Sequence, residues 1–304
     1  MGNATDVDEK RDHTARAPAL QRLREYARLM RIDRPIGIWL LLWPVLWALW
    51  VAASGHPDER LFVIFVIGTF VMRSAGCVIN DFADRELDPH VRRTADRPLA
   101  KQTISTAEAL GLFAVLGLIA LALVIPLNRP TQVLALLGGV LAVTYPFLKR
   151  FFSLPQVYLG AAFGWSVPMA FAAQTGSVPP QAWVMFLSVV LWTTAYDTIY
   201  AMVDREDDLL IGIRSSAILF GRADRAIIAM LQAGALGGLS LVGLMCGLGR
   251  WYWYGLLIAA ALAARQQWLI RARDPELCFR AFLGNNLFGL AVFAGILLDY
   301  LFAR

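Results

Sequence analysis

Long apolar runs alternate with short polar connections along this sequence. Nine of the runs are close to the length of about 20 residues that a helix needs to cross a bilayer. A segment that crosses a bilayer must satisfy its backbone hydrogen bonds internally, so these runs are expected to be helical. The predicted spans cover roughly residues 36–54, 61–79, 107–126, 132–148, 155–173, 183–203, 226–247, 251–269 and 281–302. The pattern therefore predicts an all-α integral membrane protein with about nine transmembrane helices.

The positive charges are distributed unevenly over the connections between these runs. If the N-terminus lies in the cytoplasm, 23 of the 28 Lys and Arg residues fall on the cytoplasmic side and four on the opposite side. Lys and Arg in short loops favour the cytoplasmic side of a membrane. The distribution therefore predicts an odd number of spans and a cytoplasmic N-terminus. It also accounts for the net charge of +5 without nucleic acid as a partner.

The composition favours one membrane domain, because 58% of the 304 residues are hydrophobic. We expect a single transmembrane domain over residues 31–304, preceded by a polar cytoplasmic segment over residues 1–30. That segment has no apolar stretch of the kind found in a secretory signal. The three cysteines show no metal-ligand spacing and imply no disulfide framework.

An acidic stretch over residues 80–88 follows one of the long apolar runs. If the helix of that run continues through it, Asn80, Asp84 and Asp88 lie at positions i, i+4 and i+8, and Asp81 lies close to the same face. Three or four oxygen ligands would then line one side of one helix.

A second acidic stretch repeats the pattern about 120 residues later, again after a long apolar run and before a long polar connection. Asp197, Tyr200, Asp204 and Asp208 lie at i, i+3, i+7 and i+11. On a continuous helix these side chains would also share one face. The two stretches suggest an internal repeat of four spans, with a ninth helix added.

Carboxylates at the ends of membrane helices are costly to bury and usually serve a function. They could simply mark the water boundary, but that explanation does not account for a repeated spacing on one face. Mg²⁺ prefers oxygen ligands and often binds one or two carboxylates together with substrate phosphate oxygens. Two such clusters facing one cavity could hold a diphosphate and promote ionisation of an allylic carbon–oxygen bond.

Both stretches resemble signatures of the UbiA family of intramembrane aromatic prenyltransferases. The first is Asn80-Asp81-x-x-Asp84-x-x-x-Asp88, and the second is Tyr196-Asp197-x-x-Tyr200-Ala201-x-x-Asp204-x-x-Asp207-Asp208. The similarity extends from about residue 31 to 222 and includes Arg31-x-Asp33-Arg34-Pro35-x-Gly37 and Tyr145-Pro146-Phe147-Leu148-Lys149-Arg150. Within the family, the sequences of these motifs are most similar to the branch that prenylates 4-hydroxybenzoate in ubiquinone biosynthesis. One departure is Ala100-Lys101, where many relatives have a small residue and Gly.

This resemblance implies a Mg²⁺-dependent reaction. A polyprenyl group passes from polyprenyl diphosphate to the ring carbon ortho to the hydroxyl of 4-hydroxybenzoate, and diphosphate leaves. The resemblance implies that Asn80, Asp84 and Asp88 coordinate one Mg²⁺. Asp204 and Asp208 would coordinate the other. Asp81 and Asp197 are second-choice ligands or accept hydrogen bonds beside the ligands. The implied catalytic set is Asp84, Asp88, Asp197, Asp204 and Asp208.

Arg73 is a candidate for binding the acceptor. It lies two helical turns before Asn80 on nearly the same face. An arginine within a span needs a partner to offset its burial. Its planar guanidinium suits the two oxygens of a benzoate carboxylate. A structural pair with an acid or with backbone carbonyls is the alternative.

Other candidate substrate-binding residues lie in and beside the two motifs. Tyr196 and Tyr200 could act with Asp197 to polarise the phenol. The candidates for clamping diphosphate from the loop side are Arg97, Lys101, Lys149, Arg150 and Arg214. For each of these five, the positive-inside bias alone is an equally good explanation. Arg97 and Arg214 rank highest because each follows an acidic motif by a similar distance.

Trp39, Trp43, Trp47 and Trp50 form an aromatic stripe on the first predicted span. They could form a wall for an isoprenoid tail and stabilise cationic character. Helix packing and interfacial anchoring is the interpretation that we favour.

Two alternatives remain at the level of function. Within the same family, the acceptor could be homogentisate, a naphthoate or a porphyrin. In another class, a secondary transporter could use intramembrane carboxylates, although transporter sites tend to lie at the membrane midplane on broken helices. We expect helices around a central cavity that opens to the cytoplasm, with the prenyl chain entering from membrane lipid. A bacterial inner membrane is the expected compartment, with the mitochondrial inner membrane second, and no obligatory protein partner is implied.

Overall fold

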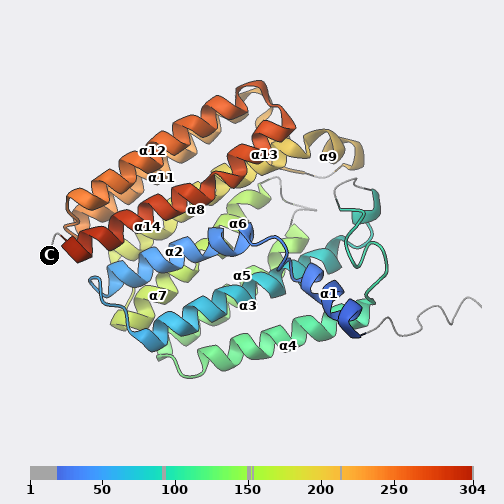
Figure 1. Ribbon diagram of the computed structural model, residues 1–304, viewed down its shortest axis with the longest axis horizontal. Helices are drawn as coiled ribbons and strands as arrows, with labels where there is room; N and C mark the ends of the chain where they lie inside the picture. Colours follow the sequence, from blue (N-terminus) through green and yellow to red (C-terminus); the bar gives the residue numbers. More distant parts are fainter. Residues whose placement is uncertain (1–18, 91–93, 149–151, 153, 213, 303–304) are drawn as a thin grey trace, which may run out of the picture.

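A computed structural model describes residues 19–90, 94–148, 152, 154–212 and 214–302. Over these residues the chain is helical and contains no strand (Figure 1). The α-helices are α1 (Ala19–Leu29), α2 (Ile36–Ala52), α3 (Glu59–Asp84), α4 (Thr106–Val124), α5 (Arg129–Leu148), α6 (Pro155–Gly164), α7 (Ser166–Thr175), α8 (Pro180–Val203), α9 (Arg205–Ile211), α10 (Ser216–Phe220), α11 (Asp224–Met245), α12 (Arg250–Leu269), α13 (Pro275–Leu283) and α14 (Asn285–Phe302). Three short 3₁₀ turns are η1 (Asp88–His90), η2 (Gly221–Ala223) and η3 (Ile270–Ala272).

Each predicted span contains helix, and the chain is a multi-pass membrane protein. Six helical stretches in the described part are long and apolar enough to cross a membrane: Glu59–Asp84, Thr106–Val124, Arg129–Leu148, Pro180–Val203, Ser216–Met245 and Pro275–Phe302. Helix α2 is apolar but shorter, and the predicted span 155–173 is divided at Trp165 between α6 and α7. The count of nine is therefore not confirmed and remains a prediction.

Helix α8 forms the centre of the bundle. It packs against α11, α6 and α13, and residues around its full circumference are buried. Helices α4 and α5 lie at the periphery. In each of them, only 11% of an apolar 18-residue stretch is buried inside the protein. An apolar helix that is so little covered by protein is suited to contact with lipid.

Helices α12 and α14 pack closely at glycines. A Cβ atom on Gly255 would lie 2.6 Å from the carbonyl oxygen of Ala291 and 2.8 Å from the Cα atom of Gly295. Small residues allow such close backbone approach, which is a common way to hold membrane helices together because lipid provides no hydrophobic driving force between them.

The amphipathic helix α1 docks against the first long connection, between α3 and α4. Arg22 forms an ion pair with Glu108 in the first turn of α4, and the Tyr26 hydroxyl donates to the same carboxylate at 3.0 Å. Arg28 Nη2 donates to the carbonyl oxygen of Asp96 in the connection at 3.0 Å. These contacts fix the connection against the end of the bundle.

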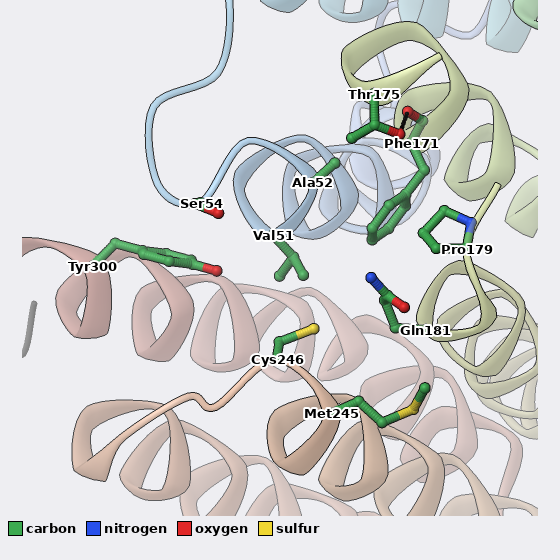
Figure 2. Close-up of a pocket in the computed structure, with 10 residues that line it drawn as sticks. All are labelled: Val51, Ala52, Ser54, Phe171, Thr175, Pro179, Gln181, Met245, Cys246 and Tyr300. Carbon is green, nitrogen blue, oxygen red and sulfur yellow. Dashed lines mark hydrogen bonds between the residues drawn. The ribbon is translucent and has the colours of Figure 1, made fainter. Parts of the chain in front are cut away.

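A small cavity of about 180 Å³ lies at the end of the bundle where α2, α11 and α14 finish (Figure 2). Val51, Phe171, Gln181, Met245 and Tyr300 contribute to its walls. Helix α3 begins at this end and reaches its acidic residues at the other. The cavity therefore lies far from the acidic motifs.

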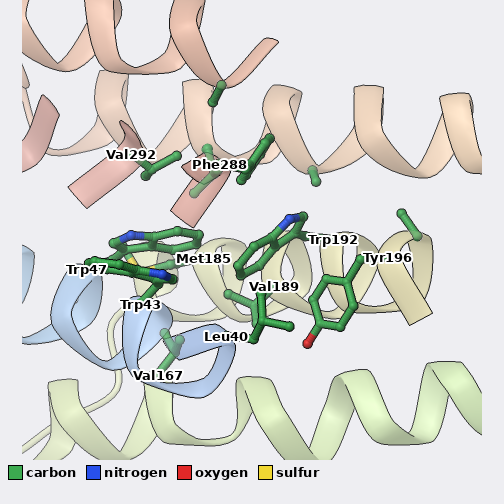
Figure 3. Packing of buried hydrophobic residues seen from close by; sticks show 14 of the residues in the cluster. Leu40, Trp43, Trp47, Val167, Met185, Val189, Trp192, Tyr196, Phe288 and Val292 are labelled. Carbon is green, nitrogen blue, oxygen red and sulfur yellow. The ribbon is translucent and has the colours of Figure 1, made fainter. Parts of the chain in front are cut away.

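Buried aromatic side chains join α2, α8 and α14 (Figure 3). The Trp47 and Trp192 rings lie with centroids 5.3 Å apart, and Trp192 stacks on Phe288 at 5.3 Å. Trp43 and Trp47 donate to Asn286 Oδ1 and to the carbonyl oxygen of Gly289, respectively. The packing interpretation of the tryptophan stripe is thus confirmed for these two residues, whose indole nitrogens are satisfied by α14.

Candidate active site

The first acidic motif lies where α3 ends. The helix continues through Asn80 to Asp84, and the Asn80 Nδ2 atom lies 3.3 Å from Asp84 Oδ2. The predicted shared face is therefore confirmed for these two residues. Asp88 is different, because it lies in the 3₁₀ turn η1 beyond the end of the helix.

The prediction that Asp88 continues the helical face is wrong because Pro89 follows it. A residue before proline is disfavoured in the α conformation, and proline itself supplies no backbone N–H. The chain turns instead, with the Leu87 N–H donating to the Asp84 carbonyl oxygen at 2.8 Å. Asp88 nevertheless stays beside the helix end, and only 4% of it is exposed.

Arg97 reaches back from the first long connection to Asp88. Its Nη1 atom lies 3.0 and 2.9 Å from the two carboxylate oxygens of Asp88 and 3.1 Å from Asp81 Oδ1. Burial raises the pKa of the Asp88 carboxyl above its ordinary value, and the charge of Arg97 acts in the opposite direction. Thr94 Oγ1 donates to the Asp88 carbonyl oxygen at 3.0 Å. The structure thus brings the predicted cation Arg97 to the first motif.

Asp81 is completely buried. It accepts from Arg31 Nη2 at 2.8 Å in addition to its contact with Arg97. Sequence reasoning assigned no role to Arg31, although it lies in a stretch that carries the family resemblance. The Asp81 carboxylate therefore links the turn before α2 to the connection after α3.

The second acidic motif also departs from one continuous helix. Helix α8 contains Tyr196, Asp197 and Tyr200 but ends at Val203, and Asp204 adopts φ −101° and ψ 7°. Asp208 then lies in the short helix α9, with its N–H donating to the Asp204 carbonyl oxygen at 2.8 Å. The prediction of one uninterrupted face was wrong at Asp204. The first residue of α9, Arg205, forms an ion pair with Asp224 of α11, with its Nη1 atom 3.4 Å from Asp224 Oδ2.

Residues of both motifs converge near Tyr145 on α5. The Tyr145 hydroxyl lies within electrostatic reach of Asp84, Asp197 and Arg73, and of Tyr196. Helices α3, α5 and α8 therefore contribute to one site at the end of the bundle where both long connections lie (Figure 1). Sequence reasoning did not single out Tyr145 as a site residue, although its stretch carries the resemblance.

Arg73 lies in α3, one helical turn before Cys77, to whose Sγ atom it donates at 2.6 Å. Its guanidinium occupies the space beside Gly37 of α2, where a Cβ atom would overlap it. The absence of a side chain at Gly37 therefore makes room for the arginine head group.

The other predicted site residues are two tyrosines of α8 and three basic residues of the connections. Tyr196 is buried beside Trp192, and the Tyr200 ring packs against Phe282 with centroids 4.5 Å apart. Arg214 is exposed between α9 and α10. Lys149 and Arg150 lie outside the described residues.

A metal site is not preassembled in the described part of the chain, which holds no group of three or more His, Cys, Asp or Glu side chains placed to bind a metal ion. The two arginines on Asp81 and Asp88 explain part of this arrangement, since they occupy carboxylate oxygens. The donors at the helix ends are carboxylate and amide oxygens, with Asn80 and Asp84 adjacent on one face. This donor chemistry fits Mg²⁺.

The chain is similar to known proteins over most of its length. Residues 41–292 match the UbiA prenyltransferase family. The 4-hydroxybenzoate octaprenyltransferase of Nitrosococcus oceani is 60% identical over 283 residues, which cover 93% of this chain and 99% of the relative. The enzyme of the same name from Alkalilimnicola ehrlichii is 59% identical over 275 residues, covering 90% of this chain and 94% of the relative.

Solved structures share the fold. The apo structure of a UbiA homolog from Aeropyrum pernix K1 has a TM-score of 0.76 at 26% identity, covering 86% of this chain and 97% of that one. A UbiA homolog from Archaeoglobus fulgidus, bound to GPP and Mg²⁺, has a TM-score of 0.68 at 19% identity, with 90% and 99% coverage.

Proposed function

The chain belongs to the UbiA prenyltransferase family, and we propose that it transfers a polyprenyl group from polyprenyl diphosphate to the ring carbon ortho to the hydroxyl of 4-hydroxybenzoate. In this reaction the allylic carbon–oxygen bond breaks, and diphosphate leaves with the electron pair. A carbon–carbon bond forms, and the ring proton is lost. The observation that carries the proposal is the identity of 60% over 283 residues to a protein named for this reaction, and the adjacent oxygen donors Asn80 and Asp84 at the end of α3 support it.

The acidic motifs supply the donors for a divalent metal, which we propose to be Mg²⁺. Asn80, Asp84 and Asp88 would hold one ion, and Asp204 with Asp208 the other. Bound Mg²⁺ would neutralise the diphosphate and so favour cleavage of the carbon–oxygen bond. Asp88 must exchange its contact with Arg97 for the metal, which leaves the Arg97 guanidinium beside the site to bind phosphate oxygens.

Arg73 is the residue that we assign to the benzoate carboxylate. Its guanidinium lies on the motif-bearing helix, within electrostatic reach of the Tyr145 hydroxyl. Two parallel N–H donors would orient the acceptor ring. Asp197 lies near the same tyrosine and could accept a hydrogen bond from the phenol, which would increase electron density at the ortho carbon.

The membrane supplies the prenyl substrate. Helices α4 and α5 face lipid, and α5 carries Tyr145 at its site end. We propose that the chain enters the site from the bilayer, while the benzoate and Mg²⁺ arrive from the water phase. The excess of Lys and Arg at the end that holds both motifs supports a cytoplasmic site in a bacterial inner membrane.

A second candidate is prenyl transfer to another aromatic acceptor by the same site. The metal donors would be unchanged, because they act on the diphosphate. Arg73 favours an acceptor that carries a carboxylate. A homogentisate or a naphthoate would meet that requirement as well, and formation of the prenylated product from each acceptor distinguishes them.

Prenyl transfer in isolated membranes tests the proposal. Membranes containing the protein receive 4-hydroxybenzoate and a short prenyl diphosphate, with Mg²⁺ or with EDTA, and membranes with the Asp84→Asn variant serve as the matched control. Mg²⁺-dependent formation of prenylated benzoate, absent from the control, supports the function. Release of diphosphate without that product would move the acceptor to another compound. Intact prenyl diphosphate with verified folded protein would overturn the prenyltransferase assignment.

A further inference from the structure

Asp224 is a completely buried carboxylate outside both acidic motifs. It begins α11, and two arginines from different connections pair with it. Arg205 comes from the second long connection, and Arg273 comes from the turn between α12 and α13. A charge that is fully removed from water is retained only when partners compensate for its lost hydration. Asp224 therefore joins two cytoplasmic-end segments that are far apart in sequence.

Arg273 forms the stronger of the two contacts. Its Nε atom lies 2.8 Å from Asp224 Oδ2, and its Nη2 atom lies 2.6 Å from Oδ1. Nη2 also donates to the carbonyl oxygen of Arg222 at 3.0 Å. Arg273 itself has φ +56°, a left-handed conformation that costs energy for a residue with a side chain. The two-pronged contact holds the arginine in this conformation and fixes the turn against the start of α11.

Arg205 carries the link to the second motif. Its Nη1 atom lies 3.4 Å from Asp224 Oδ2, and its backbone directly follows Asp204. Helix α9 begins at Arg205 and contains Asp208 one turn later, bonded through its N–H to the Asp204 carbonyl oxygen. A helix of seven residues is too short to be stable by itself. Its placement therefore depends on contacts with the rest of the protein, and the pair between Arg205 and Asp224 is one of these at its first residue.

We propose that Asp224 is a positioning residue for the second acidic motif. It anchors Arg205, orients α9, and so sets where Asp204 and Asp208 point, while Arg273 keeps the Asp224 carboxylate in place. This inference rests on the proposed function in one respect, the role of Asp204 and Asp208 as donors to Mg²⁺. Groups that orient metal ligands typically affect metal affinity by about 10- to 100-fold.

The first motif is held by a similar arrangement. Asp81 is likewise completely buried and contacts one arginine from its own long connection, Arg97, and one from a separate turn, Arg31. In each half of the protein, a buried aspartate with two arginines thus ties the acidic motif's connection to a neighbouring turn. The parallel lies in the buried aspartate and its two arginines, since Asp81 belongs to its motif whereas Asp224 follows the second motif in the chain.

The test uses single substitutions that keep size and remove charge. Asp224→Asn and Arg205→Gln break the proposed tether, and Arg205→Lys restores its charge. Arg280→Gln is the matched control, because its ion pair with Glu276 lies nearby in α13 but is exposed on both sides. If Asp224→Asn does not fold, Arg205→Gln still decides the question. The Arg205 side chain is partly exposed, and Asp224 keeps Arg273 as its partner when Arg205 is replaced.

Two readouts separate positioning from a merely structural role. Hydrogen exchange of the purified protein reports on the backbone of 204–212. Electron paramagnetic resonance measures Mn²⁺ binding in the presence of geranyl thiodiphosphate, which cannot turn over readily. We expect faster exchange in 204–212 and Mn²⁺ binding weakened by about tenfold in Arg205→Gln, with recovery in Arg205→Lys and wild-type values in Arg280→Gln.

The inference is overturned if folded Arg205→Gln keeps wild-type exchange and Mn²⁺ affinity, or if Asp224→Asn lowers thermal stability without changing either. The double variant Asp224→Asn/Arg205→Gln should have the same Mn²⁺ affinity as whichever single variant binds Mn²⁺ more weakly, because the two substitutions remove the same contact. Additive losses would mean that the two residues act separately. If wild-type protein binds no Mn²⁺, the proposed metal role of the motif fails, while hydrogen exchange still decides whether Asp224 orders α9.

Discussion

Arg97 holds both carboxylate oxygens of Asp88, at 3.0 and 2.9 Å from the same Nη1 atom. The third acid of the first motif is thus paired with a cation from the connection that follows it. Charge-assisted contacts of this kind are about twice as strong as neutral hydrogen bonds. Under the proposed function, a metal ion and the guanidinium would compete for the same oxygens, and the displaced guanidinium would donate hydrogen bonds to the diphosphate.

Arg97→Gln should therefore raise the KM for prenyl diphosphate by about tenfold, the effect of losing one contact to a charged group. The Mg²⁺ concentration for half-maximal activity should not rise, since a competitor for Asp88 is removed. Steady-state kinetics in membranes measure both quantities. Lys101→Gln is the matched control, because Lys101 lies in the same connection and was also a candidate from the sequence, but the structure pairs it with the exposed Asp96 and places Arg97 on the acidic motif. Equal effects of the two substitutions would contradict a specific role for Arg97.

Asp84→Ala and Asp204→Ala should each lower turnover by about 100-fold or more, because each removes a proposed ligand of the metal ion that would neutralise the leaving diphosphate. The protein should remain folded in membranes, as judged by its elution from a size-exclusion column after extraction. Near-normal activity in either variant would refute a site built from both motifs. A loss in only one of them would leave a single functional motif.

Arg73→Ala should raise the KM for 4-hydroxybenzoate far more than the KM for prenyl diphosphate, because its guanidinium is assigned to the carboxylate of the acceptor. Gly37→Ala should act in the same direction with a smaller effect, since the new methyl group would displace the flexible head group of Arg73. Gly68→Ala is the control for Gly37→Ala, because a Cβ atom there meets nothing within 4 Å. Parallel increases in both KM values would indicate that Arg73 is structural.

Gly255→Ala should destabilise the protein by about 1–3 kcal/mol, the usual cost of forcing an extra group into a packed contact. The new methyl would meet the backbone of α14 at Ala291 and Gly295, which cannot move as a side chain can. Thermal unfolding of the purified protein in detergent should show a lower Tm. Gly237→Ala in α11, where a Cβ atom meets nothing within 4 Å, should leave the Tm unchanged or raise it. An unchanged Tm for Gly255→Ala would mean that α12 and α14 separate at little cost.

Much of the fold could be predicted because hydrophobic length and charge bias are local properties. Apolar runs of membrane length must be helical, and α2, α4, α5, α8, α11 and α12 follow the predicted segments closely, whereas α9 and α10 were not predicted and the span 281–302 crosses the break between α13 and α14. The break of the span 155–173 at Trp165 was not predicted, although the sequence contains a signal for it: Pro168 supplies no N–H to the carbonyl of Gly164, the last residue of α6, and its ring crowds that carbonyl. Such a break depends on what neighbouring helices offer to the released backbone groups.

The sequence by itself determined the chemistry of the site: oxygen donors in two repeated stretches, an arginine within a span, and basic connections on one side. It also contained the signal that ends the first helical face, Pro89. Only the tertiary structure decided the partners of these charges. Arg31 on Asp81 and Arg273 on Asp224 join segments about 50 residues apart, and Arg97 on Asp88 and Arg205 on Asp224 close loops within the two long connections. Side-chain periodicity specifies which residues share a face of one helix, whereas a buried charge selects its partner from whatever the packed bundle brings within reach.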